Sequence, residues 1–504
     1  MNIFKHNFQY ALSVSKTLGM TCLLTLMLNA CSQEQSNQVD ADAGMAVLSG
    51  QLSQPFAYSG YSNPQYSGQR RESLYIPVED GTRLAATLFF PEDGPVQQFP
   101  AILWYLPGHR ESIDTATGEL QPYGSREQID FFTSHGYVWV LVEMRGSGAS
   151  FGTRIDRSPQ IGVDGRDVVE WLAQQSWSNG SVGMVGSSYQ GFSQYATAAQ
   201  KPAGLKAIFP EIAGFDEYSI MFYPGGIENI AMSSFASANI ARDDQNYFIP
   251  AISPEEASAD QGPRRAVLPS APVVDEDGDG ELADEIPLDL NGNGTFLDDG
   301  EPQYADGNER EDLYFLASQA HVENINFTGD FVSAAPNRDS PLADTGLIYS
   351  QLGPAEKLQA IAESGIAVYV RGGWFDYHAR CVAQWFASLD GHTETKLLIG
   401  PSAHSGFGGG FWSHFDPGLD EANLNQEKLR FFDYHLKGID NGIEDEAPVY
   451  IYTFGKGWRA EQEWPLSRAV DTRWYFSANH SLSQDEVTSG TDAYEVNLHA
   501  DSRS

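Results

Sequence analysis

A chain of 504 residues is longer than one hydrophobic core normally supports, so two or more domains are expected. Apolar residues make up 41% of the chain and aromatic residues 12%, which excludes a protein that is disordered throughout. The 68 acidic side chains outnumber the 30 basic ones, and the formal net charge is −38. Because binding to nucleic acid requires clustered Lys and Arg, nucleic acid is excluded as an expected partner.

The N-terminus has the pattern of a bacterial export signal. Lys5 and Lys16 precede an apolar run over 20–28, which is too short to cross a bilayer comfortably. The run ends in the letters LNAC, which resemble the lipobox of bacterial lipoproteins, and by that resemblance Cys31 is lipidated and begins the mature chain. We therefore expect a secreted protein that a lipid anchors to a membrane, in the periplasm, at the outer membrane or at the cell surface. Simple secretion is the alternative.

Apolar runs that suit buried strands recur along the chain. They are LAATLFF (84–90), AILWYLP (101–107), YVWVLVEM (137–144), SVGMVGS (181–187), LKAIFPEIA (205–213), IAVYVRGG (366–373) and KLLIGP (396–401). Between them, DGRDVVEWLAQQ (164–175) places Val168, Trp171 and Leu172 on one helical face. Continuous apolar runs are typical of strands buried on both faces, so the alternation predicts a doubly wound α/β sheet.

This alternation is interrupted between about 214 and 355, and it ends after 443. An insertion of that size within an α/β domain is most simply a cap over the active site. After 443 the runs PVYIYTFG and TRWYFSAN predict strands of a β-domain for which the remaining residues are too few. The expected parts are a signal peptide (1–31), a polar tether (32–70), the first part of the α/β core (71–213), the cap (214–355), the second part of the core (356–443) and the start of a truncated C-terminal β-domain (444–504).

The segment GSSYQG, at 186–191, directly follows a predicted strand and precedes a stretch compatible with a helix. Strand, sharp turn and helix are the setting of a nucleophile elbow, in which small residues must flank the nucleophile. If Ser187 were the nucleophile, Val185 would occupy the position two before it. Ser188 instead has Gly186 at that position and is the candidate nucleophile.

A serine nucleophile needs a base and an acid that orients the base. In the order typical of α/β-hydrolases both follow the serine, at the carboxyl ends of later strands. Asp376 follows the strand predicted over 366–373, and His404 follows the strand predicted over 396–401. Position and order favour His404 over the other histidines, which are expected at the surface or in ordinary hydrogen bonds. Those considered are His109, His135, His378, His392 and His414.

Several sequence blocks resemble those of the CocE/NonD (cocaine esterase-like) hydrolases and the related X-prolyl dipeptidyl aminopeptidases. GSSYQG matches the G-x-S-Y-x-G elbow of that family. VEMRGSGASFG, which precedes it, and GGWFDYH, LLIGPSAHSG and RFFDYHLKGIDNG, which come after it, also resemble family blocks in the family's order, and together the blocks cover roughly 75–480. The resemblance implies an α/β-hydrolase core with an inserted helical cap and a C-terminal jelly roll. It also implies Ser188 as nucleophile, Asp376 as orienting acid and His404 as base.

Two donors are expected to hold the oxyanion that forms during acyl transfer. The backbone N–H of Tyr189, one residue after the nucleophile, is the first. In the family the proline that ends the strand 101–107 is usually followed by a tyrosine that donates the second hydrogen bond, but here Gly108 follows Pro107. The second donor is open among the backbone N–H of Gly108 or His109 and the hydroxyl of Tyr105.

The expected cap contains a strongly acidic stretch. Residues 275–312 hold fifteen Asp and Glu against one Arg. Two segments within 275–301 have the alternating oxygen ligands and the glycine of a calcium loop, although position 12 is not acidic in either. The candidate ligands are Asp275, Asp277, Asp279, Asp289, Asn291 and Asn293. Calcium is expected as a structural ion, with a flexible acidic loop as the alternative.

Two functions are compatible with these patterns. The first is a serine hydrolase that cleaves a small ester, or an amide such as an X-Pro peptide, through an acyl-enzyme and without a cofactor for the chemistry. Peptide trimming would need an acid that holds the substrate ammonium; Asp216 and Glu217 are candidates, and a solvated loop is the alternative. The second function is a calcium-dependent surface binding protein on a hydrolase scaffold. The intact Ser, Asp and His set favours the enzyme, and nothing indicates the oligomeric state.

Overall fold

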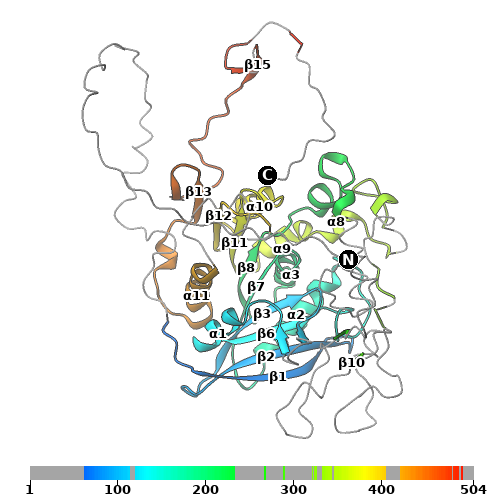
Figure 1. Ribbon diagram of the computed structural model, residues 1–504, viewed down its shortest axis with the longest axis vertical. Coiled ribbons are helices and arrows are strands. Elements are labelled where there is room, and N and C mark those ends of the chain that lie inside the picture. Colours follow the sequence, from blue (N-terminus) through cyan, green and yellow to red (C-terminus); the bar gives the residue numbers. More distant parts are fainter. Residues whose placement is uncertain are drawn as a thin grey trace, which may run out of the picture. The chain divides into compact units, whose positions relative to one another are not determined.

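A ten-stranded sheet organises the fold (Figure 1). The computed structural model describes residues 62–113, 120–232, 266–267, 288–289, 320–321, 323–325, 332–342, 345–404, 421–478, 481–486 and 490–491. The strands of the sheet are β1 (Gly68–Pro77), β2 (Arg83–Glu92), β3 (Phe99–Leu106), β6 (Val138–Glu143), β7 (Ser178–Ser187), β8 (Leu205–Glu211), β11 (Ala367–Gly373), β12 (Thr395–Gly400), β13 (Val449–Thr453) and β14 (Gly457–Glu461).

The strand order is β1-β2-β6-β3-β7-β8-β11-β12-β13-β14. The pairings β1–β2, β2–β6 and β13–β14 are antiparallel, and all the others are parallel. The parallel α/β sheet expected from the sequence is confirmed. Because β7, β8, β11 and β12 are parallel neighbours, their carboxyl ends meet at one edge of the sheet.

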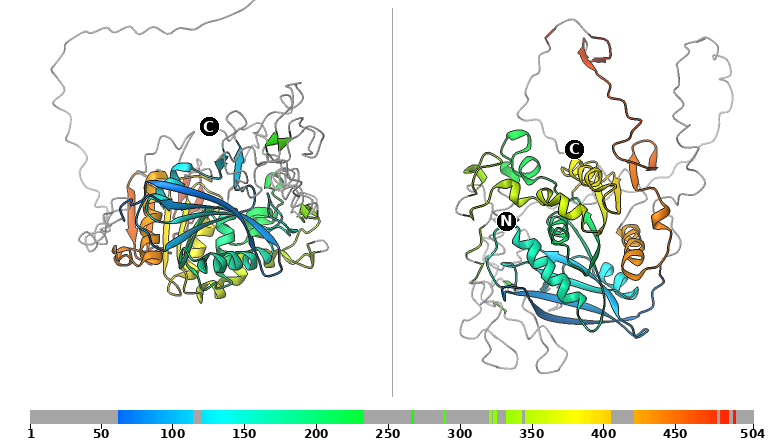
Figure 2. Two further views of the ribbon diagram at one scale, coloured as in Figure 1. Left: turned by 90° about the horizontal axis from the view of Figure 1, so that it is seen from below. Right: turned by 180° about the vertical axis from the view of Figure 1, so that it is seen from behind.

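Helices cover both faces of this sheet (Figures 1 and 2). They are α1 (Arg126–Ser134), α2 (Gln160–Ala173), α3 (Tyr189–Ala198), α10 (Ala379–Leu389) and α11 (Glu421–Lys437), with the short α8 (Tyr349–Leu352) and α9 (Leu358–Ala362). Apolar side chains of α2, α3 and α10 form one core cluster with the sheet, and those of α1 and α11 form the other. Along β6, Val140 belongs to the first cluster and Leu141 to the second, which explains why these strands are continuously apolar.

The predicted boundary at 444 is wrong. β13 pairs in parallel with β12, and β14 pairs with β13, so both strands extend the central sheet. Val449 and Ile451 lie in the same core cluster as Leu397. An apolar strand pattern shows that a segment is a strand but does not identify its partner, which is why these strands were expected in a separate β-domain. Beyond them, β15 (Tyr475–Ser477) and β16 (Ser481–Ser483) form a sheet of their own.

The polar tether predicted to reach residue 70 is also too long. β1 already begins at Gly68. Tyr66 is buried, and its hydroxyl donates to the carbonyl oxygen of Pro95 at 2.8 Å. The ordered core therefore starts before the expected limit.

The described part of the expected cap has a small core of its own. It is formed by Met221, Phe222, Tyr223, Val332, Ala335, Leu342, Tyr349 and Leu352. The expected lipidation site and the candidate calcium ligands lie outside the described residues, apart from the backbone of Asp289. That residue belongs to β10 (Leu288–Asp289), which pairs with β9 (Ala266–Val267). Among the helices that the structure describes, none has the length and apolar character needed to cross a membrane.

Candidate active site

Ser188 lies in a strained turn between β7 and α3, with φ 57° and ψ −115°. The neighbouring glycines make this turn possible. A Cβ atom on Gly186, whose φ is +135°, would lie 2.5 Å from the Cβ of Gln190, and one on Gly191 would lie 2.8 Å from the Cβ of Ala213. The backbone N–H of Ser188 donates to the carbonyl oxygen of Glu211 at 2.9 Å, which ties the turn to β8. GSSYQG therefore has the strand-turn-helix geometry of a nucleophile elbow.

The structure brings Ser188, His404 and Asp376 together from the ends of three strands. The Nε2 atom of His404 lies 3.1 Å from the Oγ atom of Ser188. On the other side of the ring, Nδ1 lies 2.7 Å from the Oδ2 atom of Asp376. One continuous chain of hydrogen bonds therefore connects the carboxylate, the imidazole and the hydroxyl, as nucleophilic catalysis by serine requires.

Two separate donors fix the carboxylate of Asp376. Its Oδ2 atom faces His404, and its Oδ1 atom accepts the backbone N–H of His378 at 2.6 Å. Burial alone would raise the pKa of Asp376, but the hydrogen bonds from His378 and His404 outweigh burial and hold the pKa well below its usual range. The carboxylate is therefore charged at neutral pH and cannot rotate without losing a hydrogen bond.

Tyr189 begins α3, so its backbone N–H is the first of the helix and has no acceptor within the helix. Its side chain is locked, because the hydroxyl donates to Oδ1 of Asp156 at 2.6 Å and accepts the backbone N–H of Arg157 at 3.0 Å. The guanidinium of Arg157 also lies over the Tyr189 ring, 4.6 Å from its centroid. The N–H is thus held rigidly beside Ser188, where an oxyanion would form.

The loop after β3 contains the candidates for the second oxyanion donor. β3 is paired with β7, and the carbonyl oxygen of Pro107 accepts from Nη1 of Arg154 at 2.9 Å. A Cβ atom on Gly108 would meet nothing within 4 Å, so the space beside this residue is open. Tyr105, by contrast, is fully buried in the core cluster that contains α2, where its hydroxyl has no access to a substrate. The structure therefore disfavours Tyr105 and leaves the backbone N–H groups of Gly108 and His109 as candidates.

Both candidate ammonium anchors are paired with arginines. Glu217 is buried, and its Oε2 atom lies 3.1 Å from Nη1 of Arg157. Asp216 receives two hydrogen bonds from Arg338, one of them 2.9 Å long, and one from the hydroxyl of Ser219 at 2.6 Å. Neither carboxylate is an uncompensated negative charge.

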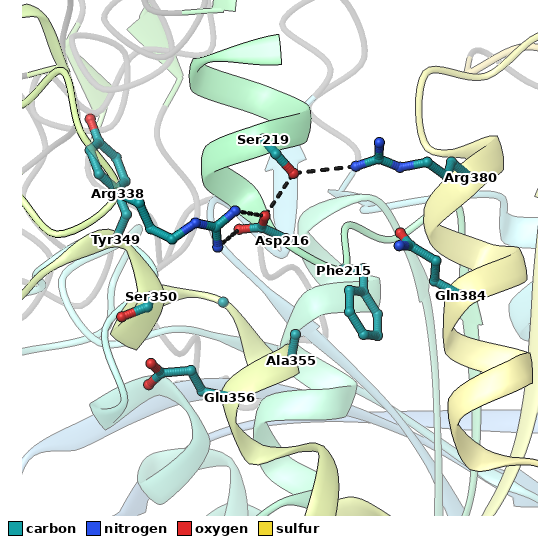
Figure 3. A pocket seen from close by; sticks show the side chains of 11 residues that line it. Phe215, Asp216, Ser219, Arg338, Tyr349, Ser350, Ala355, Glu356, Arg380 and Gln384 are labelled. Atoms are coloured by element: carbon teal, nitrogen blue, oxygen red, sulfur yellow. Dashed lines mark hydrogen bonds and ion pairs between the residues drawn. The ribbon is translucent and has the colours of Figure 1, made fainter. Parts of the chain in front are cut away.

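Asp216 lines a hollow of about 300 Å³ (Figure 3). Its lining consists of Phe215, Asp216, Ser219, Arg338, Tyr349, Ser350, Gly353, Ala355, Glu356, Arg380 and Gln384. The side chains of Arg338 and Ser219 converge on Asp216, while Arg380 reaches Ser219 from α10. The hollow thus contains the ion pair of Asp216 with Arg338 together with Glu356 and Arg380, and the Ser188, Asp376 and His404 side chains do not line it.

Two residues of the site escaped the sequence-based reasoning. The hydroxyl of Tyr377 lies 3.3 Å from Nε2 of His404. His378, considered above only as a competing histidine, is buried with Nδ1 3.4 Å from Oδ1 of Asp376. Both follow Asp376 directly in the loop after β11, so their position in the sequence was an available signal.

Asp376, His378 and His404 also place a carboxylate oxygen and two ring nitrogens within 4.8 Å of one another. Such a cluster can in principle hold a metal ion. Here both ring nitrogens of His404 already have partners, Asp376 at Nδ1 and Ser188 at Nε2. The geometry therefore favours a proton-transfer role for this histidine.

Comparisons with known proteins agree with this geometry. The sequence profile of the X-Pro dipeptidyl-peptidase (S15) family matches residues 80–250. A Mycobacterium bovis protein described as a serine esterase is 29% identical over an alignment of 462 positions that covers 86% of this chain and 67% of that protein. Cocaine esterase from a Rhodococcus species is 26% identical, over 85% of this chain and 67% of that enzyme.

The fold is that of a CocE/NonD family hydrolase from Staphylococcus aureus, with a TM-score of 0.54 and 21% identity. That likeness covers 84% of this chain and 61% of the solved chain, so the chain spans about three fifths of that structure's length. The fold class expected from the sequence, an α/β-hydrolase core, is confirmed. The chain is thus similar to the X-Pro dipeptidyl-peptidase (S15) family over residues 80–250 and to esterases along most of its length, and these comparisons support a serine hydrolase.

Proposed function

We propose that the protein is a carboxylic ester hydrolase in which Ser188 is the nucleophile, His404 the base and Asp376 the orienting acid. The observation that carries this proposal is the chain of hydrogen bonds at 3.1 Å and 2.7 Å that begins at a serine in a strained elbow. Strain of this kind persists only where the surrounding structure enforces it, and it is concentrated at functional sites.

In the proposed reaction Oγ of Ser188 forms a bond to the carbonyl carbon of the ester while His404 Nε2 takes the hydroxyl proton. The backbone N–H of Tyr189 donates to the oxyanion of the tetrahedral intermediate. The bond to the leaving alcohol then breaks, and His404 returns the proton to the leaving oxygen. Water attacks the acyl-enzyme by the same route, with His404 again as the base, and releases the acid.

We favour an ester over a peptide with a free N-terminus as the substrate. An X-Pro dipeptidyl-peptidase must bind the substrate ammonium, and an unpaired carboxylate is the natural partner for it. In the described part of the chain, both Asp216 and Glu217 are paired with arginines, which an ammonium would have to displace. The family profile supports X-Pro dipeptide release as the second candidate.

Labelling with a fluorophosphonate tests the proposed nucleophile, and the sequence supplies a matched control in the adjacent serine. We expect the wild-type chain and Ser187→Ala to become labelled and Ser188→Ala to remain unlabelled, because only Ser188 lies in the elbow beside His404. Mass spectrometry of the labelled peptide measures the site. Labelling of Ser188→Ala at the wild-type rate would contradict the proposal, and an unreactive wild-type chain would favour the calcium-dependent binding protein instead.

A comparison of leaving groups and acyl groups tests the substrate class. We expect hydrolysis of p-nitrophenyl esters to exceed that of Ala-Pro-p-nitroanilide, because the nitroanilide requires an ammonium site as well as the catalytic residues. Initial rates measured by absorbance provide the comparison. Faster cleavage of Ala-Pro-p-nitroanilide would overturn the ester assignment and favour the dipeptidyl-peptidase.

We also propose that the protein is exported and anchored through a lipid on Cys31, and that the segment 275–301 binds calcium as a structural ion. Support comes from the LNAC sequence at the end of the apolar run and from the alternating Asp and Asn side chains before each glycine. Both segments lie outside the described residues. Neither the lipid nor calcium takes part in the proposed chemistry.

A further inference from the structure

The hydroxyl of Tyr377 lies beside the atom that takes the proton in the proposed reaction. Its oxygen is 3.3 Å from Nε2 of His404. Since Oγ of Ser188 lies 3.1 Å from the same Nε2, the two hydroxyls share this nitrogen as a neighbour. Tyr377 follows Asp376 directly, so the loop that orients the base also supplies this phenol.

The position of this hydroxyl relative to a bound ester follows from the chemistry. The leaving oxygen is attached to the carbon that Oγ attacks, and it must also contact Nε2 to receive a proton. The Tyr377 hydroxyl contacts one of these atoms, Nε2. The residue is 40% exposed, so a substrate can reach its hydroxyl. A leaving oxygen that contacts Nε2 therefore lies next to the phenol.

We propose that Tyr377 is a further catalytic residue, whose phenolic O–H donates a hydrogen bond to the leaving oxygen of the ester as the bond to that oxygen breaks. This inference rests on the proposed ester hydrolysis at Ser188. The phenol keeps its own proton: the Oγ–carbon bond forms, the carbon–oxygen bond breaks, and the proton delivered to the leaving oxygen comes from His404 Nε2.

Two further observations support a donor at this position. The Tyr377 ring stacks on the His404 ring, with centroids 4.6 Å apart and an interplanar angle of 27°. Its centroid also lies 4.1 Å from that of the His378 ring, so two aromatic neighbours define the position of Tyr377. Burial and the nearby charge of Asp376 raise the pKa of Tyr377 to about 12. The phenol is therefore a neutral donor throughout the neutral pH range.

The test compares two esters that share an acyl group and differ in leaving group. Ethyl butyrate releases an alkoxide that needs stabilisation, whereas p-nitrophenyl butyrate releases a stable phenolate. We expect Tyr377→Phe to lower kcat/KM for ethyl butyrate by about 10- to 100-fold and to change kcat/KM for p-nitrophenyl butyrate about threefold or less. The value of kcat/KM is the appropriate measure because it reports acylation, the step in which the leaving group departs.

The matched control is Tyr218→Phe, which removes a hydroxyl that donates to the carbonyl oxygen of Pro336 and not to His404. This control should leave kcat/KM for both esters unchanged. If Tyr377→Phe lowers kcat/KM equally for the two esters, the proposal is overturned and Tyr377 acts as an oxyanion donor. If Tyr377→Phe leaves kcat/KM for ethyl butyrate unchanged or raises it, the proposal is also overturned, and the phenol instead blocks the site until a substrate displaces it. Fluorophosphonate labelling separates the two hypotheses, because Tyr377→Phe should label like the wild type. A wild-type chain that does not label would overturn both.

Discussion

Asp376→Asn should lower kcat for ester hydrolysis by about four orders of magnitude while leaving the fold intact. The reason lies in the two donors that fix this side chain. Oδ1 accepts the backbone N–H of His378 at 2.6 Å, so the amide oxygen of the asparagine will take that position. Its NH2 group will then face Nδ1 of His404, which must become the acceptor. The ring proton moves to Nε2, and the imidazole can no longer accept the proton of Ser188.

Steady-state kinetics with p-nitrophenyl butyrate measures this loss, and circular dichroism checks the fold. Asp433→Asn is the control for the loss of a buried carboxylate elsewhere. Asp433 is also fully buried and accepts the hydroxyl of Tyr137 at 2.7 Å, but it lies in α11, away from the elbow. We expect the control to keep most of its activity at temperatures where it stays folded. A loss of less than about tenfold in Asp376→Asn would show that another group orients His404.

Glu211→Gln should have the largest effect on stability, lowering the free energy of unfolding by about 3–5 kcal/mol. Glu211 ends β8, and its carboxylate is buried between two cations. Oε2 lies 3.2 Å from Nη1 of Arg371 in β11, and Oε1 lies 2.5 Å from Nζ of Lys428 in α11. An amide of the same size would leave both cations buried without their shared counter-charge. Urea denaturation followed by tryptophan fluorescence measures the change.

The pH dependence of this effect has a definite sign. Burial alone raises the pKa of Glu211, but Lys428 and Arg371 outweigh burial and hold the pKa below its usual value. The interaction of Glu211 with Lys428 and Arg371 therefore stabilises the fold fully above the ordinary carboxyl pKa of about 4.3. This stabilisation is lost as the pH falls through the lower pKa that Glu211 has in the folded state. The difference between wild type and Glu211→Gln should shrink in that acidic range. Glu363→Gln, in an exposed pair with Lys201, is the control and should hardly change stability.

The proximity of Ser188, Asp376 and His404 was predictable from the sequence because each position depends on local signals. The glycines of GSSYQG occur where side chains would clash in one sharp turn. Asp376 and His404 each follow a continuous apolar strand. Parallel strands bring such positions to one edge whatever lies between them in the chain. Local pattern and fold together therefore sufficed to place these three residues near one another.

Other parts of the site depend on contacts that no local pattern encodes. The partner of β13 is set by which sheet edge is free, and the sequence of β13 is equally compatible with a separate β-domain. The pairing of Glu217 with Arg157 joins residues sixty positions apart and turns a candidate ammonium anchor into half of an ion pair. The contact between Tyr377 and His404 depends on one side-chain rotamer, held by ring stacking.

The backbone conformation of Ser188 lowers the stability of the fold at the residue that the proposed reaction uses. With φ 57° and ψ −115°, it occupies a region that costs any residue with a side chain about 1–3 kcal/mol, and only glycine adopts it freely. A sequence under selection for folding alone would carry glycine here, as it does at Gly186, whose φ is +135°. Serine at this point is consistent with the proposed role of its hydroxyl. Under that proposal, a related chain with glycine at this position should be more stable and should lack the hydrolase activity.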